Sequence, residues 1–275
     1  MAVTRRAFLL LALAACSSEK HAPVAPPPQT IRVAVIGGML ETGFWQELTT
    51  RYEAASGNKI ELVASGPKPV VIDAFRKGGI DLITLHASDA IVNLVVDGLA
   101  ADPQPWAQND LVIVGPSDDP AKIRGLDALT AVKTLVAAKA PILIHASLGA
   151  DGVMHDLEHA AGLMLPAETT QVFSGENQHQ ILARAAELHA YTMVGRIPML
   201  LGKLKQPGIE ILVRGDGRMR RPYLVAVAKR DDPRVAAARD LAAFLRKPQT
   251  QAWIATYKKG TYDDAPLFFP VVVGP

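Results

Sequence analysis

The sequence predicts an α/β fold of two lobes, with mostly parallel sheets flanked by helices and a cleft between the lobes. Three observations support this fold. After about residue 30, apolar runs rich in β-branched residues alternate with helix-like segments, which is typical of parallel sheets covered by helices. Loops of small residues follow several of the strand-like runs. Strand-like runs near residues 110 and 210 would let the chain leave one lobe and return to it.

The first lobe is predicted from segments at both ends of the chain, residues 30–114 and 215–275. Phe44, Leu48 and Tyr52 recur on one helical face, and Gly57 stands where a helix would stop. The other elements follow from apolar runs between Gly and Pro breakers. Strands are expected at 31–38, 59–65, 80–87, 110–116 and 223–229, the fourth of them after a Pro-rich turn, and helices at 42–57, 69–79, 233–245 and 248–257.

The second lobe is predicted at residues 115–214. Its strands are the short apolar runs at 141–147, 170–175, 188–194 and 209–215. A helix that contains His155 is expected after the loop at 147–152.

The N-terminal segment predicts export. Residues 1–16 form a signal peptide: RRAFLL fits a twin-arginine signal, and the apolar run is shorter than the roughly 20 residues that span a bilayer. Small residues before Cys16 are typical of a bacterial lipobox, although an ordinary secretory signal is the alternative. Cys16 is the only cysteine, so we expect a lipid anchor and no disulfide. Residues 17–29, rich in Pro and Ala, predict a flexible tether. The protein would reside in the periplasm or on the cell surface, held to the membrane by the anchor only.

Composition argues against several classes of partner. The formal net charge is only +2, and Lys and Arg are scattered along the chain, so nothing indicates nucleic-acid binding. Aromatic residues make up 5% of the chain, which disfavours a stacking surface for sugars or single strands. We expect no cofactor.

Four loops follow predicted strands and could bind a ligand, at residues 36–42, 65–68, 147–152 and 192–196. The first three lead into helices, whose free N–H groups and positive dipole ends favour negative charge. The plain alternative is that Gly and Ser are only cap and turn residues there. The occurrence of such loops after successive strands favours an anion site.

The segment HDLEH offers a metal hypothesis. His155, Glu158 and His159 lie one helical turn apart and match an inverted zinc-peptidase signature. A catalytic zinc also needs a third ligand, and Glu176 and Glu187 have no recognisable context. A solvated helix face is the simpler interpretation. A metallohydrolase or metal-binding protein stays open as the alternative of another class.

Long stretches resemble the tungstate-binding proteins of ABC transporters, a branch of the phosphate- and molybdate-type solute-binding proteins. The stretches are NDLVIVGPSDDPAKIRG, ITLHASDAIVNLVVDG, AYTMVGR, RRPYLVAVAKRDDPRV, RKPQTQAWIATY and APLFFP. The resemblance implies a type II periplasmic binding protein, a monomer and not an enzyme, that captures a small tungstate- or molybdate-like oxyanion and passes it to an ABC permease and ATPase.

The resemblance also implies ligand residues, but several have changed. The family's Thr/Thr/Ser loop is Ile36-Gly37-Gly38 here, and the arginine of its central loop, SRGDDSGTH, is Leu148. Arg196 survives from the family's YTLTDR and would supply the counter-charge, so Arg196→Ala should weaken binding without disturbing the fold. The predicted ligand residues are Gly37, Gly38, Thr42, Ser65, Gly66, Ser147, Gly149 and Arg196. Because of these changes the sequence does not identify the ligand, and another small solute or a sensor or adaptor role stays open.

Overall fold

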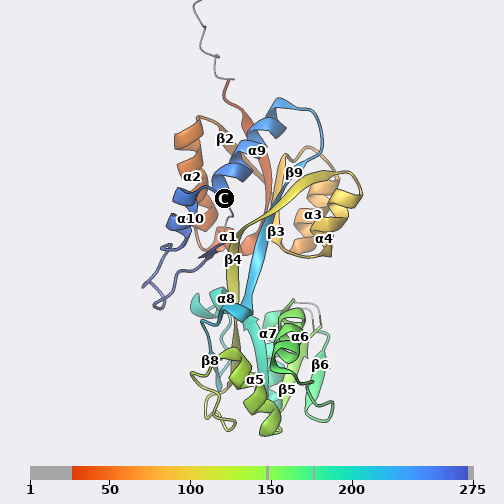
Figure 1. Ribbon diagram of the computed structural model, residues 1–275, viewed down its shortest axis with the longest axis vertical. Coiled ribbons are helices and arrows are strands. Elements are labelled where there is room, and N and C mark those ends of the chain that lie inside the picture. Colours follow the sequence, from red (N-terminus) through yellow and green to blue (C-terminus); the bar gives the residue numbers. More distant parts are fainter. Residues whose placement is uncertain (1–26, 147–148, 176, 272–275) are drawn as a thin grey trace, which may run out of the picture.

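The computed structural model describes residues 27–146, 149–175 and 177–271, so the predicted signal peptide, Cys16 and Ser147 lie outside the described residues. The chain forms two lobes stacked along the long axis of the molecule and joined by two long strands (Figure 1). Within the described ranges, no helix combines the length and the hydropathy that a membrane span requires.

The upper lobe of Figure 1 is built from both ends of the described chain. It contains β1 (Thr30–Ile36), α1 (Gly37–Glu41), α2 (Phe44–Ser56), β2 (Lys59–Gly66), α3 (Lys68–Arg76), β3 (Leu82–His86), α4 (Asp89–Val96), α9 (Pro233–Leu245), α10 (Pro248–Ile254) and β10 (Phe269–Pro270). The lower lobe contains α5 (Ala128–Ala137), β5 (Ile142–His145), α6 (Ala150–Ala161), β6 (Thr170–Phe173), α7 (Gln178–Leu188), β7 (Tyr191–Gly195) and β8 (Ile209–Val213). At the junction lie α8 (Arg196–Leu200), the 3₁₀ turn η1 (Gly217–Met219) and the shared strands β4 (Ala100–Pro116) and β9 (Arg220–Ala228).

The main sheet has the strand order β2-β1-β3-β9-β4-β7-β5-β6. The pairs β1–β2, β1–β3, β5–β6 and β5–β7 are parallel, whereas β9 pairs antiparallel with β3 and β4, and β4 pairs antiparallel with β7, β8 and β10. The sheets are therefore more mixed than the predicted mostly parallel arrangement. Every antiparallel pair includes β4 or β9, the two strands that belong to both lobes.

The shared strand β4 corrects the sequence analysis. Residues before 110 were expected to form a Pro-rich turn, but they are strand and pair with β9 as far as Asp110. The ladder shifts register between Ala101 and Gln104 and between Pro105 and Ala107. Such bulges tolerate prolines, which cannot donate a ladder hydrogen bond. Beyond Asp110 the same strand pairs with β7, so one continuous strand belongs to both lobes.

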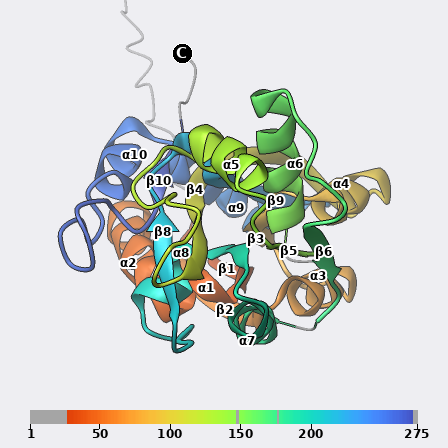
Figure 2. The ribbon, with the colours of Figure 1, turned by 90° about the horizontal axis from the view of Figure 1, so that it is seen from below.

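Each lobe has its own core. The upper core lies on both sides of β1, β3 and β9, while the sheet of the lower lobe separates two smaller clusters. Along β4, Leu111 and Ile113 face the cluster under α5 and α6, and Val112 and Val114 face the cluster under α7. Figure 2 shows these helices on opposite sides of the lower lobe. Burial on both faces explains why this part of β4 reads as a continuous apolar run.

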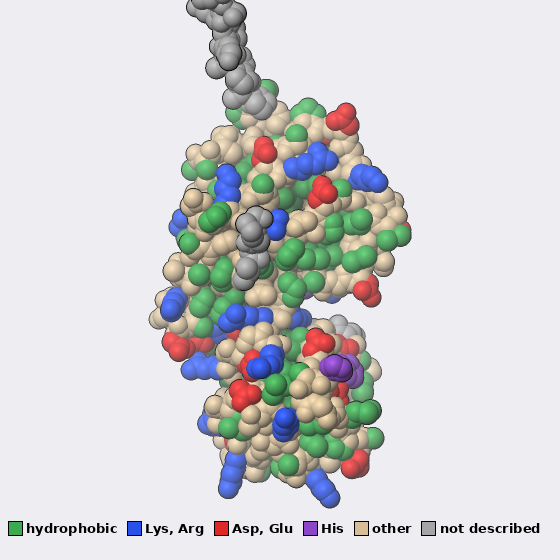
Figure 3. Space-filling model, viewed as in Figure 1, with side chains coloured by type: hydrophobic (Ala, Val, Ile, Leu, Met, Phe, Trp, Pro, Cys, Tyr) green, Lys and Arg blue, Asp and Glu red, His purple; other side chains and the backbone are tan. Residues whose placement is uncertain are grey.

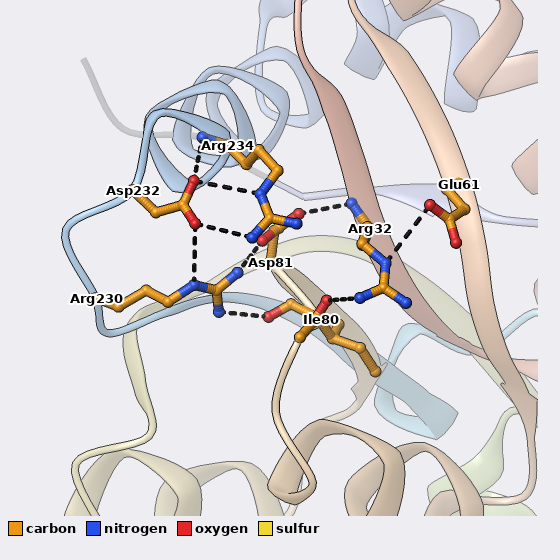
Figure 4. A network of polar contacts seen from close by, with 8 residues as sticks. Arg32, Glu61, Ile80, Asp81, Arg230, Asp232 and Arg234 are labelled. Atoms are coloured by element: carbon orange, nitrogen blue, oxygen red, sulfur yellow. Dashed lines mark hydrogen bonds and ion pairs between the residues drawn. The ribbon is translucent and has the colours of Figure 1, made fainter.

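A charged network closes the outer end of the upper lobe (Figure 4). Asp81 is fully buried; it forms an ion pair with Arg230 and accepts the Arg32 backbone N–H at 2.7 Å. Asp232 caps the start of α9 by accepting the Arg234 N–H at 2.8 Å. Buried charges are tolerated when they are paired and hydrogen-bonded in this way. The network therefore joins β1, β3, β9 and α9 and explains these charges structurally.

Candidate functional site

The loops that follow the parallel strands meet at the junction of the lobes. In the upper lobe, β1, β2 and β3 run side by side in the same direction and lead into α1, α3 and α4. In the lower lobe, β5 leads into α6. Figure 1 shows α3 and α4 above α6. On that side, Figure 3 shows that the surface is indented between the lobes. Carboxyl ends of parallel strands are where α/β folds bind ligands.

The structure brings Gly37 and Gly66 together. Ile36 pairs with Gly66 at the ends of β1 and β2, and a Cβ added to Gly37 would lie 3.5 Å from the Gly66 Cα. Gly37, Gly38 and Gly66 are partly exposed and Ser65 is exposed. The beginning of α1 and the end of β2 therefore present backbone groups at one place on the surface of the upper lobe.

Arg221 of β9 lies beside the beginning of α6 in the lower lobe, and the sequence analysis missed it. It pairs with Asn109 of β4, and a Cβ added to Gly149, at the start of α6, would lie only 3.1 Å from Arg221 Nη1. Two residues along β9, the ring of Tyr223 stacks on His86 of β3 with centroids 4.2 Å apart. Arg221 thus lies between the end of β3 and the beginning of α6.

Three basic side chains act on one another at this place. Burial lowers the pKa of Lys68, the first residue of α3, and the charge of Arg221 lowers it further, while Asp89 opposes the shift. Burial also holds the pKa of His86 well below its usual value, and the charges of Arg221 and Lys68 act in the same direction. Burial lowers the pKa of Arg221 itself. Groups arranged so that each disfavours the charge of the next create a positive potential that an anion would relieve.

Thr42 points into the protein. It is 2% exposed, and its hydroxyl donates to the Met39 carbonyl at 3.1 Å and accepts the Phe44 N–H at 3.4 Å. Its own carbonyl accepts the Tyr257 hydroxyl at 2.9 Å and Lys258 Nζ at 2.8 Å. The threonine therefore fixes the turn between α1 and α2, and its assignment to the ligand stays a prediction.

Arg196 is also buried and bound within the protein. It is 1% exposed, and its guanidinium donates to Asp263 at 3.1 and 2.5 Å, to Asp110 at 3.3 Å and to the Pro266 carbonyl at 3.0 Å. These contacts use the charge of Arg196 to hold the C-terminal segment against β4. Its assignment as counter-charge to the ligand stays a prediction.

Gly149 has a backbone conformation that suits glycine. Its φ is 68°, in the left-handed region where a Cβ costs about 1 kcal/mol, and Arg221 leaves little room. We expect Gly149→Ala to lower the free energy of unfolding by about 1 kcal/mol or more and to weaken ligand binding. The matched control is Gly152→Ala, in the exposed first turn of α6 with nothing within 4 Å, which should be neutral or slightly stabilising. Urea unfolding of both variants checks this; equal stability would show that the left-handed turn carries no strain.

Within the described residues the HDLEH segment makes contacts other than to a metal, and Glu176, a candidate third ligand, lies outside those residues. Glu158 is bound on both oxygens, by His155 Nδ1 at 2.6 Å and by the Leu165 N–H at 2.6 Å beyond the end of α6. No group of three or more potential ligands among His, Cys, Asp and Glu comes together in the part of the chain that the structure describes. Glu158 therefore fastens the end of its helix.

Comparison with known proteins decides the family. The model of the bacterial extracellular solute-binding protein family matches residues 31–257, which is most of the chain. The chain belongs to this family. The solute-binding protein is therefore not an enzyme, and the metallohydrolase alternative is set aside. The recognition of a bacterial solute-binding protein in the sequence is confirmed.

Relatives of the solute-binding protein agree with its fold. It is 25% identical to the tungstate-binding protein TupA of Peptoclostridium acidaminophilum over 98% of this chain and 96% of that protein. The structure of the tungstate-binding protein TupA from Desulfovibrio alaskensis G20 superimposes with a TM-score of 0.67 at 22% identity, covering 89% of this chain and all of that one. The tungstate ABC transporter structure from Geobacter sulfurreducens gives 0.62 at 23%, covering 83% and 98%. The predicted type II fold class is confirmed.

Proposed function

We propose that this solute-binding protein captures a small oxyanion between its lobes and delivers it to an ABC permease and its ATPase. The observation that supports this most directly is the convergence on Arg221: Gly149 of the lower lobe lies against its guanidinium, and its charge acts on Lys68 and His86 of the upper lobe. The ligand would also accept hydrogen bonds from the segments around Gly37, Gly38, Ser65, Gly66, Ser147 and Gly149. Thr42 and Arg196, the other two residues predicted from the sequence, are left out because their side chains are bound within the protein.

Capture would proceed by closure of the lobes. β4 and β9 connect the lobes, and the residues that would contact the ligand belong to both of them. A ligand that binds both lobes at once has higher affinity for the closed form, and this difference in affinity drives closure. The lobe boundaries that we propose are residues 30–114 with 215–275 and residues 115–214.

The setting of the protein follows from its N-terminal sequence. We propose export by the signal peptide at 1–16, attachment of a lipid to Cys16, and a tether at 17–29 that leaves the lobes free to reach a permease. The protein would act as a monomer without a cofactor, outside the cytoplasm.

A thermal-shift screen tests the function. Purified protein is heated with tungstate, molybdate, sulfate or phosphate, with chloride at the same ionic strength as the control, and with zinc and small organic acids in parallel. We expect one of the oxyanions to stabilise the fold by a few kcal/mol at saturation, since a ligand at 100 times its dissociation constant contributes about 2.7 kcal/mol. Stabilisation by an organic acid or a cation alone would contradict the proposal, as would no stabilisation at all.

A further inference from the structure

We propose that Arg221, on the strand shared by both lobes, is the principal counter-charge for the ligand and, with Lys68, selects a doubly charged oxyanion over a singly charged one. This inference rests on the proposed function. It assigns the recognition of the ligand's charge to a residue of β9, one of the two strands that form the hinge between the lobes. This residue lies outside the loops from which the resemblance predicts ligand residues.

The first argument is the position of Arg196, which the sequence analysis expected to supply the counter-charge. Arg196 is already bound by two carboxylates and a carbonyl. An oxyanion buried without a cation would lose its hydration for neutral hydrogen bonds only, and charge-assisted bonds are about twice as strong. The site therefore needs another cation, and Arg221 stands beside Gly149.

The second argument is that Arg220 and Arg221 lie on opposite faces of β9 and have different surroundings. Side chains alternate along a strand, so the neighbours Arg220 and Arg221 project to opposite faces of β9. Arg220 stacks on the Phe269 ring at 3.8 Å and pairs across the ladder with Asp110, on the side where Arg196 is bound. Arg221 pairs with Asn109 on the side of the loops. The adjacent arginines thus have different surroundings, and only one of them faces the proposed site.

The third argument is the polar atoms beside Arg221. His86 and Asn109 are polar residues whose side-chain atoms Nε2 and Oδ1 are buried beside Arg221. Asn109 lies opposite Arg221 on β4, and His86 stacks on Tyr223 two positions along β9. The two side chains lie close enough to interact with one another. The face of the sheet that carries Arg221 is therefore lined by polar groups, as expected where a polar ligand binds.

The preference for two negative charges follows from the cations that share the site. Lys68 begins α3, two residues after Gly66, and Arg221 lies beside Gly149, so a dianion between the lobes would gain a charge-assisted bond from each cation. A monoanion of the same shape would balance the charge of only one of them. Because β9 is shared by the lobes, Arg221 would hold the ligand at the hinge while Gly149 and Lys68 approach it from the two sides.

The test compares two tetrahedral oxyanions of nearly the same size, tungstate (WO₄²⁻) and perrhenate (ReO₄⁻), by isothermal titration calorimetry. Wild-type protein should bind tungstate at least tenfold more tightly than perrhenate. Arg221→Ala should weaken tungstate binding by at least tenfold, as expected for one charged hydrogen-bonding partner, and remove most of the preference. Arg221→Lys should retain part of the affinity, because it keeps the charge without the bidentate fork. Arg220→Ala is the matched control and should bind tungstate as the wild type does.

The outcomes separate this inference from the function on which it rests. If wild type binds tungstate and Arg221→Ala binds it equally well, or if Arg220→Ala is the variant that loses affinity, the assignment of Arg221 is wrong and the function stands. Equal affinity for both anions in wild type overturns the selection by charge. If no oxyanion binds wild type, both proposals fail. Should Arg221→Ala not fold, Lys68→Met supplies the test, because the same preference should shrink in it.

Discussion

Replacing Arg196 with alanine is expected to lower the free energy of unfolding by about 3 to 5 kcal/mol, the range for removing one partner of a buried ion pair. The change leaves Asp110, 1% exposed, without its cation, and Asp263 without its two bonds from the guanidinium. It also removes the donor to the Pro266 carbonyl. The sequence analysis expected this variant to keep its fold unperturbed, and the observed contacts lead us to the opposite expectation.

The matched control is Arg214→Ala. Arg214 lies 3.4 Å from the same Asp263, but its side chain is 52% exposed, so its loss should cost less than about 1 kcal/mol. Urea unfolding of both variants measures the difference. If Arg196→Ala retains wild-type stability and instead loses tungstate affinity, Arg196 is a ligand residue after all.

The cost of Arg196→Ala should also depend on pH. Burial tends to raise the pKa of Asp263, but the hydrogen bond and charge of Arg196 overcome it and hold the pKa below its usual value. A carboxylate with a depressed pKa contributes stability above its unfolded pKa, about 4, and loses that stability as the pH falls. Without Arg196, Asp263 no longer has this depressed pKa to lose. The stability gap between wild type and variant should therefore narrow as the pH falls below about 4, through the depressed pKa of Asp263.

The sequence predicted the order of strands well because that signal is local. Each predicted strand overlaps an observed one, since apolar runs bounded by Gly and Pro reflect burial directly. Several elements were missed, among them α4, α5 and α7, and two of the misses have a local reason. The first half of β4 contains Asp-Pro-Gln-Pro, which resembles a turn, and α1 begins with Gly37-Gly38, which resembles a loop. Bulges and a short helix accommodate residues that usually break regular structure.

The candidate site was predicted less well because it depends on distant pairings. The loops at Gly37, Gly66 and Gly149 followed from the rule that ligands bind at the ends of parallel strands. The contacts of Arg196 could not be predicted from the sequence, because its partner Asp263 is 67 residues away. Arg221 could be found only by knowing that β9 lies between β3 and β4. The sequence showed two adjacent arginines and alternation placed them on opposite faces, but the topology determines which face meets the loops.

Phe44→Ala is expected to lower the free energy of unfolding by about 3 to 5 kcal/mol, the range for deleting a buried aromatic ring. Phe44 is fully buried at the start of α2. Its ring stacks on Phe268 at 4.0 Å and on Trp253 at 5.2 Å, meets the edge of Tyr257 at 5.0 Å, and lies 5.9 Å from Trp106. Close-packed rings leave little freedom to refill the space, so a cavity should remain.

The effect of Phe44→Ala should extend to the hinge, because its partners belong to the segment that carries Asp263 to Arg196. Tyr257 and Phe268 enclose that segment, and the Tyr257 hydroxyl also fixes the turn at Thr42. We therefore expect Phe44→Ala and Arg196→Ala to be non-additive in a double-mutant cycle by urea unfolding, since both loosen one segment. Tyr262→Ala, an exposed ring in the same segment, should change stability by less than about 0.5 kcal/mol. If the effects of Phe44→Ala and Arg196→Ala on the free energy of unfolding are strictly additive, the aromatic cluster and the Arg196 ion pairs hold the C-terminal segment independently. In that case only the ion pairs connect this segment to the hinge.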